Sequence, residues 1–336
     1  MPVQLLPRDA VQWPTKARST ALAVAAVVLA VVLSACGTPD RKAEAERLER
    51  VIKAMPGVVD ARVDYTNDSE RGATLKLSVY LPDAPPQQIA DVASRINKVR
   101  GAAFTAFEQT AEFLVTPNRQ VRVTRDADLN PDSIAADTQS IRRFSEAVDA
   151  VQITMSGREP STPAGLRVDE VKAPADHVFA AVRAAFGNEA QINLDMVPAA
   201  NVKMPLWSVS FPFSDADQQR VDRQIAAMPV PIWSITVGTH GSITNLDVGL
   251  PTPDAAYQDL VSVIATTGAG PTHAVGLGWR LEGQSGFAAL QFKGRVDAGG
   301  CTYGTGEGEL HPELYLTPDV PELQLRLRNQ FDKCPK

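Results

Sequence analysis

The chain has 336 residues, with 33 Lys and Arg against 39 Asp and Glu, which gives a formal net charge of −6 at pH 7. An acidic chain lacks the clustered basic side chains that phosphate contacts require, so the composition argues against nucleic-acid binding. The length is sufficient for two or three small domains, at roughly 100 to 200 residues for each.

The first 35 residues have the layout of an export signal. A basic lead that contains Arg18 precedes an apolar run from Ala21 to Leu33, and the small residues Ser34 and Ala35 follow. The apolar run is shorter than the roughly 20 residues that a helix needs to cross a bilayer. We therefore interpret residues 1–35 as a signal peptide and not as a membrane span.

The four residues Leu33-Ser34-Ala35-Cys36 resemble the lipobox of bacterial lipoproteins, in which an aliphatic residue and two small residues precede a cysteine. The resemblance implies that the signal is cut before Cys36 and that lipid is attached to its sulfur. Residues 36–42 would then be a lipidated tether on the outer face of the bacterial cytoplasmic membrane. The alternative is an ordinary buried cysteine at the end of an apolar helix.

Three later segments share one local design, in which a strand leads through a proline turn into an amphipathic helix. The prolines of these turns are Pro85, Pro174 and Pro253, and a proline near the first helical turn costs no hydrogen bond. The order of elements around them is βαββαβ or αββαβ. We therefore predict an α+β protein of tandem ferredoxin-like modules, with helices packed on one side of each sheet.

The first module, residues 43–118, is predicted to be αββαβ. Its first helix has an apolar stripe that includes Leu48 and Ile52, and the turn Pro56-Gly57-Val58 follows. This turn, with the alternating valines after it, is similar to the small BON and ring-building modules of bacterial envelope proteins. That resemblance implies a non-catalytic module that binds lipid or assembles with its neighbours.

The second module, residues 119–200, contains the best candidate for a metal site. Asp126, Asp128, Asn130 and Asp132 recur at every second residue, and Asp137 is twelfth in a loop counted from Asp126. Calcium loops use this spacing, but they need glycine at the sixth position, where this chain has proline. We favour a helix start at Asn130, with a capping side chain and a proline in the first turn. No cofactor is expected.

The third module, residues 201–298, has four strands that alternate with period two. One side carries Trp207, Trp233 and Trp279, which we expect to be core residues or, as the alternative, a ligand pocket. The other side carries small polar residues and is expected to be an open face: Ser208, Ser210, Ser234, Thr236, Asn245, Asp247, Gly276 and Gly278. A fifth strand is predicted from Phe287 to Phe292.

The tail, residues 299–336, contains Cys301 and Cys334. With Cys36 lipidated, these two cysteines form an even set in an oxidising compartment, so we predict a disulfide between them. Alternating leucines near Leu325 fit a strand, whereas Pro321 and Glu322 fit the start of a helix, and the sequence leaves both open.

Catalytic motifs are scarce. The segment of residues 283–286 is one residue short of a nucleophile elbow, and the glycines of residues 304–310 lack the Lys-Ser/Thr pair of a phosphate loop. The four histidines lie in different elements without metal-ligand spacing. We therefore expect a chain that is not an enzyme.

These observations favour a lipid-anchored interaction or assembly platform that binds an envelope protein or itself. The alternative is a carrier or sensor of an apolar small molecule or lipid around the three tryptophans, which requires a pocket of a few hundred Å³. A third possibility, an envelope hydrolase, would need acidic or histidine side chains to converge in one cleft.

Overall fold

The computed structural model describes residues 39–68, 70, 72–118, 120–157, 162–283, 292–300, 319–331 and 333. Within these residues the protein is mixed α/β, with one sheet and seven α-helices. The helices are α2 (Lys42–Lys53), α3 (Pro86–Arg100), α4 (Pro131–Ala147), α5 (Ala175–Phe186), α6 (Asp215–Ala226), α7 (Ala256–Thr267) and α11 (Asp319–Phe331). The strands are β1 (Asp60–Asp68), β2 (Gly72–Tyr80), β3 (Glu108–Leu114), β4 (Val121–Arg125), β5 (Gln152–Ser156), β6 (Ala164–Val171), β7 (Ile192–Pro198), β8 (Leu206–Ser210), β9 (Ile232–Val237), β10 (Ile243–Leu250), β11 (Val275–Leu281) and β12 (Gly294–Ala298).

All twelve strands form one continuous sheet in which their spatial order is their order in the chain. Antiparallel and parallel pairs alternate along it, starting with the antiparallel pair β1 and β2. A helix joins the two strands of each parallel pair, so the chain consists of consecutive βαβ units, the first being β2-α3-β3 and the last β10-α7-β11.

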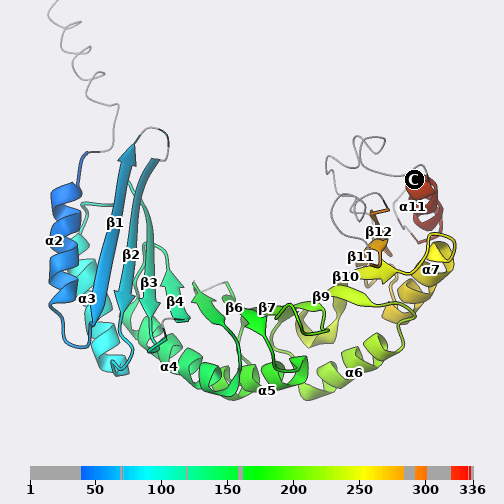
Figure 1. Ribbon diagram of the computed structural model, residues 1–336, viewed down its shortest axis with the longest axis horizontal. Helices are drawn as coiled ribbons and strands as arrows, with labels where there is room; N and C mark the ends of the chain where they lie inside the picture. The colour runs from blue at the N-terminus through cyan, green and yellow to red at the C-terminus, as the bar shows by residue number, and fades with distance from the viewer. Residues whose placement is uncertain are drawn as a thin grey trace, which may run out of the picture.

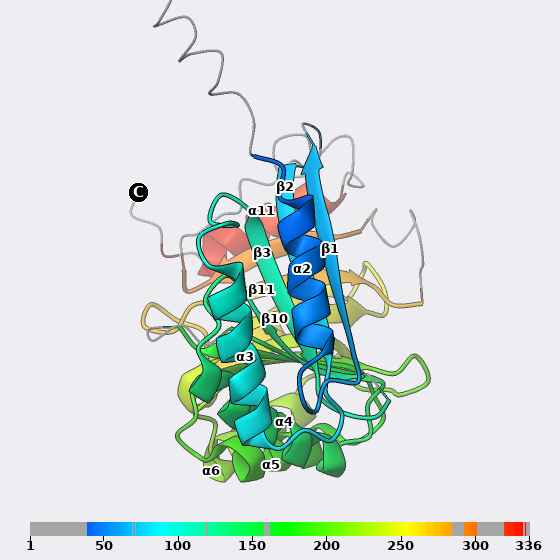
Figure 2. The ribbon, with the colours of Figure 1, turned by 90° about the vertical axis from the view of Figure 1, so that its left-hand side faces the viewer.

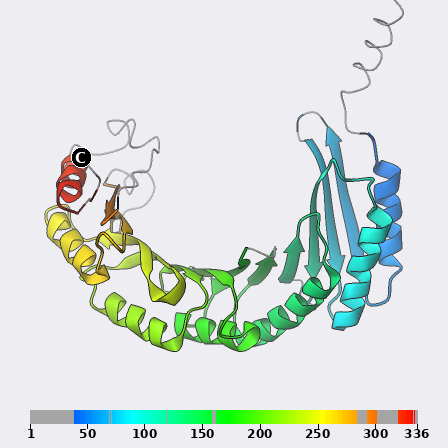
Figure 3. The same cartoon turned by 180° about the vertical axis from the view of Figure 1, so that it is seen from behind.

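The sheet is bent into an arch, and the helices lie on its convex side (Figures 1 and 3). One helix covers two strands, because about 9.5 Å of sheet matches the 8 to 10 Å between packed helices. The buried side chains form a single core cluster between the sheet and the helices, with Leu48 at one end and Leu327 at the other. Among the described residues, no helix lies on the concave side of the sheet (Figures 1 and 3).

The structure does not confirm the tandem ferredoxin-like modules. In a split βαβ arrangement another strand lies between the two strands of each unit, whereas here those two strands pair directly. The sheet also continues across both expected module boundaries: Phe113 pairs with Val123, and Leu194 pairs with Val209.

This topology has a consequence for the hand of the crossovers. Strands of one βαβ unit run antiparallel to those of the next, while the chain advances in one direction and the helices stay on one face. Successive crossovers must therefore have opposite hands. Since roughly 98 % of such connections are right-handed, the sequential order is one that general rules would not have favoured.

Most helix starts agree with the sequence. The Asn130 side chain accepts a hydrogen bond from the Ser133 amide at 3.0 Å and caps α4. Ser214 and Asp217 form a capping box at α6, and Pro174 is the N-cap of α5. The undecided tail segment is the helix α11. The strand expected at Phe287 to Phe292 lies almost wholly outside the described residues, and the strand observed beside β11 is β12.

Candidate functional site

The concave face of the sheet is the candidate site. The strand side chains that point toward the helices are buried or partly buried, and those between them point to the concave side of the arch. The latter are mainly small, polar or charged: Arg62, Asp64, Lys76, Glu112, Arg122, Thr124, Thr154, Arg167, Asp169, Asn193, Asp195, Ser208, Ser210, Ser234, Thr236, Asn245, Asp247, Arg280, Arg295 and Asp297. Both signs of charge are interspersed along its length.

Polar contacts cross the concave face from strand to strand. Glu112 lies between two basic side chains, with Lys76 at 3.0 Å and Arg122 at 3.9 Å. Further along, Ser210 donates to Asn193 at 2.9 Å and Ser234 donates to Asp247 at 2.6 Å. Exposed pairs of this kind contribute roughly 0 to 1 kcal/mol each, so a bound partner could replace them at small cost.

Two glycines of β11 shape this face. A Cβ at Gly276 would lie 2.4 Å from Oδ1 of Asn245, and a Cβ at Gly278 would lie 2.1 Å from Oδ1 of Asp247. The side chains of β10 can therefore lie flat on the neighbouring strand. These four residues are on the face where the sequence placed them.

The three tryptophans do not share one environment. Trp207 and Trp279 lie in the core and are 6 % and 2 % exposed, as their strand patterns predicted. Trp233 is 36 % exposed, so the expectation that it is a core residue is wrong. The register between β9 and β10 shifts between Asp247 and Val248, and this irregularity changes which side of the sheet the residue faces. Trp233 lies over Gly249 on the concave face.

Trp233 forms one wall of a small hollow of about 170 Å³, which we call the Trp233 hollow. Its other lining residues are Leu206, Ser234, Asp247, Trp279, Arg280 and Lys293. The guanidinium carbon of Arg280 is 3.6 Å from the centroid of the Trp233 ring, a distance at which cations are attracted to the ring face.

A larger hollow of about 470 Å³ lies beside the first turn of α6. Its charged groups engage one another: Arg183 is 2.5 Å from Asp215 and donates to the Phe213 carbonyl, and Asp217 completes the capping box. His240 lines the same hollow. The Ser214 hydroxyl also donates to Asp217 at 2.6 Å as part of the capping box. These contacts hold α5 against α6 and engage the charged groups in structural roles.

Two residues of the candidate calcium loop, Asn130 and Asp137, have structural roles. Asn130 caps a helix, and Asp137 is buried in an ion pair with Arg125 beneath the sheet. Among the described residues, no group of three or more His, Cys, Asp or Glu side chains is placed to hold a metal ion. Cys36, Cys301 and Cys334, with the lipidation and disulfide predicted for them, lie outside the described residues.

Both edges of the sheet are capped by a helix side chain. The Val63 amide of β1 donates to Glu49 of α2 at 3.0 Å, and the Arg295 amide of β12 donates to Gln324 of α11 at 3.1 Å. Such contacts use edge donors that another strand would need for pairing. This feature could not be predicted from the sequence, since only the fold brings each helix to its edge.

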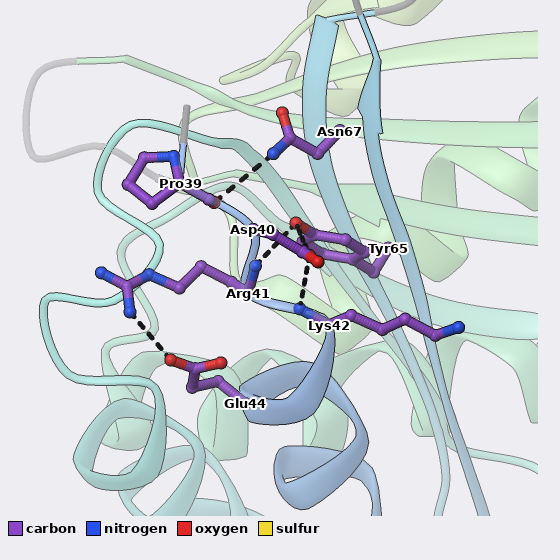
Figure 4. Close-up of polar contacts among 7 residues, drawn as sticks. All are labelled: Pro39, Asp40, Arg41, Lys42, Glu44, Tyr65 and Asn67. Carbon is purple, nitrogen blue, oxygen red and sulfur yellow. Dashed lines mark hydrogen bonds and ion pairs between the residues drawn. The ribbon is translucent and has the colours of Figure 1, made fainter. Parts of the chain in front are cut away.

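The first described residues are held against β1 (Figure 4). The Tyr65 hydroxyl donates to Asp40 at 2.9 Å and accepts from the Arg41 amide at 2.8 Å, and Asn67 donates to the Pro39 carbonyl at 3.4 Å. The hydrogen bonds that the Asp40 carboxylate accepts from the Lys42 amide and from the Tyr65 hydroxyl lower the pKa of Asp40. Figure 2 shows that α2 begins beside the hairpin end of β1 and β2. The chain therefore enters the fold at the tip of one arm of the arch.

No family model, no curated protein and no solved structure matches this chain. In the part of the chain that the structure describes, every helix is too short or too polar to be a candidate membrane span. The features that bear on function are therefore those of the chain itself.

Proposed function

We propose that this chain is a bacterial envelope lipoprotein, anchored through Cys36, whose concave face binds a partner protein without catalysis. The observation that carries the proposal is the twelve-stranded sheet with its helices on the convex side only. In the described part of the chain, the concave face carries polar side chains and no helical layer (Figure 1), so its strands are available for contact with a partner.

The lipobox supports the lipid anchor, and the position of the first described residues places one arm of the arch close to that anchor. Three peptide steps separate Cys36 from Pro39, which is held against β1. At roughly 3.5 Å for each residue, the tip of the arm would lie within about 10 Å of the lipidated sulfur. A partner that is itself bound to the membrane would therefore meet the arch most readily.

The chemistry of the concave face favours a protein as the partner. It carries interspersed charges of both signs, unlike the basic stripe that a nucleic acid requires. Hydroxyl, amide and carboxylate groups provide both donors and acceptors for backbone and side-chain groups of a bound chain. The capped edges disfavour assembly by strand addition, so contact through the face is the better route.

The carrier of an apolar molecule has less support. Ligand pockets usually enclose about 300 to 1,000 Å³, whereas the Trp233 hollow has about 170 Å³. Trp207 packs edge to face on Phe179, with ring centroids 5.1 Å apart. This packing is typical of a core and not of a vacant site.

The test is photo-crosslinking in intact cells that produce the full chain. A photoreactive residue replaces Thr154, in the middle of the concave face, or Gln139, which is exposed on α4 on the convex side. We expect one discrete protein adduct from position 154 and none from position 139. Equal labelling from both positions, or a lipid adduct from position 154, would contradict the proposal. Cys36→Ser should remove incorporation of labelled palmitate, and unchanged incorporation would refute the anchor.

A further inference from the structure

The Trp233 hollow carries two basic side chains without a hydrogen-bond or ion-pair partner among the described residues. Arg280 stacks on Trp233, and neither it nor Lys293 has a hydrogen bond or ion pair with the described part of the chain. The indole N–H of Trp279 is buried and has no acceptor there. That N–H belongs to the core, so the groups that suit an oxygen-bearing ligand are the two cationic side chains, Arg280 and Lys293.

The sheet holds the hollow in shape. A Cβ at position 249 would lie 2.4 Å from Nε1 of Trp233, so glycine at this position lets the indole rest on β10. The indole in turn supports the planar guanidinium of Arg280. A guanidinium held flat on a ring still presents its N–H edges, which match the two oxygens of a carboxylate.

The charge of the lining selects between anions. Arg280 and Lys293 are basic and Asp247 is acidic, so the formal charge of the lining is +1 at neutral pH. Asp247 already accepts from Ser234 and would repel a second negative charge. This balance suits a singly charged carboxylate better than a phosphate.

We propose that the Trp233 hollow binds an acidic side chain of the partner protein that lies on the concave face. This inference rests on the proposed function. Trp233 and Arg280 supply the contact surface and the donor pair, and Lys293 supplies a further positive charge. An extended partner crossing the face would be fixed in register at this point.

The test uses the full mature protein in detergent micelles, with ¹⁵N-labelled tryptophan. The indole signals of Trp207, Trp233 and Trp279 are assigned through single Trp→Phe variants and followed by NMR during titration with N-acetylglutamate α-amide. We expect saturable shifts of the Trp233 and Trp279 signals in the millimolar range. Trp207 is an internal control, because its N–H is also buried without an acceptor among the described residues but does not line the hollow.

Matched probes and variants define the outcomes. Arg280→Gln should weaken the response by about tenfold or more, as expected for loss of a charged donor pair. Arg295→Gln, on the same face but paired with Asn245 and Asp297, should retain it. Equal shifts with the glutamine analogue, tighter binding of inorganic phosphate or of N-acetylglycine, or no shift at all would overturn the inference. The titration contains neither membrane nor partner, so its failure leaves the crosslinking result standing.

Discussion

Arg142 is predicted to hold the first βαβ unit on the rest of the arch. This residue of α4 donates four hydrogen bonds to main-chain carbonyls of the preceding unit: to Val115 at 2.8 Å, Ala84 at 2.8 Å, and Leu81 and Pro82 at 3.0 Å each. Burial lowers the pKa of Arg142 from its ordinary value. At about 1 kcal/mol net for each bond, Arg142→Leu should cost about 4 kcal/mol.

Its neighbour Arg143 provides a matched control. Arg143 donates to the Ala185 carbonyl at 2.9 Å and to Ser140 at 3.3 Å, so by the same rule Arg143→Leu should cost about 2 kcal/mol. The assay is urea unfolding of both variants, combined with amide hydrogen exchange. Because stability in a repeat array is local, Arg142→Leu should raise exchange in α3 and leave α6 protected. An equal cost for the two variants, or uniform loss of protection, would refute the reasoning.

Three further predictions concern single contacts. Asp137→Ala leaves Arg125 buried without its carboxylate and should cost about 3 to 5 kcal/mol of stability. The double variant Arg125→Met with Asp137→Leu should recover most of that stability. Urea unfolding would measure both variants, and no recovery in the double variant would contradict the buried pair. Gly249→Ala places a Cβ against the Trp233 indole, so the Trp233 indole signal should move while overall stability falls by less than about 3 kcal/mol; an unmoved signal would count against the contact. The hydrogen bond from Lys53, and then that from the Val63 amide, lower the pKa of Glu49 below its ordinary 4.5. The stability that this carboxylate adds is therefore complete above pH 4.5 and is lost as the pH falls through the folded-state pKa. As the pH falls below 4.5, the Val63 amide should lose exchange protection relative to the Val79 amide in β2. Parallel changes at both amides would argue against a specific role of the Glu49 carboxylate.

Local structure could be predicted well from the sequence. Asn130 and Ser214 cap helices through their own side chains, and such contacts lie within one turn of the chain. Strand periodicity correctly divided the residues of β10 and β11 between core and open face. These signals depend only on neighbours in the sequence.

Strand order could not be predicted in the same way. The order βαββαβ is common to the ferredoxin-like fold and to this arch, and periodicity shows which face a side chain takes but not which strand lies beside it. The usual right-handed crossover also favours other arrangements. Only the observed pairs, such as β3 with β4, identify the continuous sheet.

Most of the concave face could be predicted, but its most distinctive residue could not. A single irregularity in β9 turns Trp233 away from the side that strict alternation assigns to it. The available hint was Gly249, whose small size is needed only if a large side chain rests on it. Arg142 gave no signal, since its four acceptors are 27 to 61 residues away.

The sequential strand order also makes the arch elastic. Neighbouring units supply the main contacts, from α2 with α3 through to α11 with α7. A change of about 2° at each interface, small against the roughly 25° spread of interstrand twist in sheets, would turn one arm about 20° relative to the other. The distance between the two arms can therefore change at small energetic cost. A partner that touches both arms would bend the whole sheet elastically.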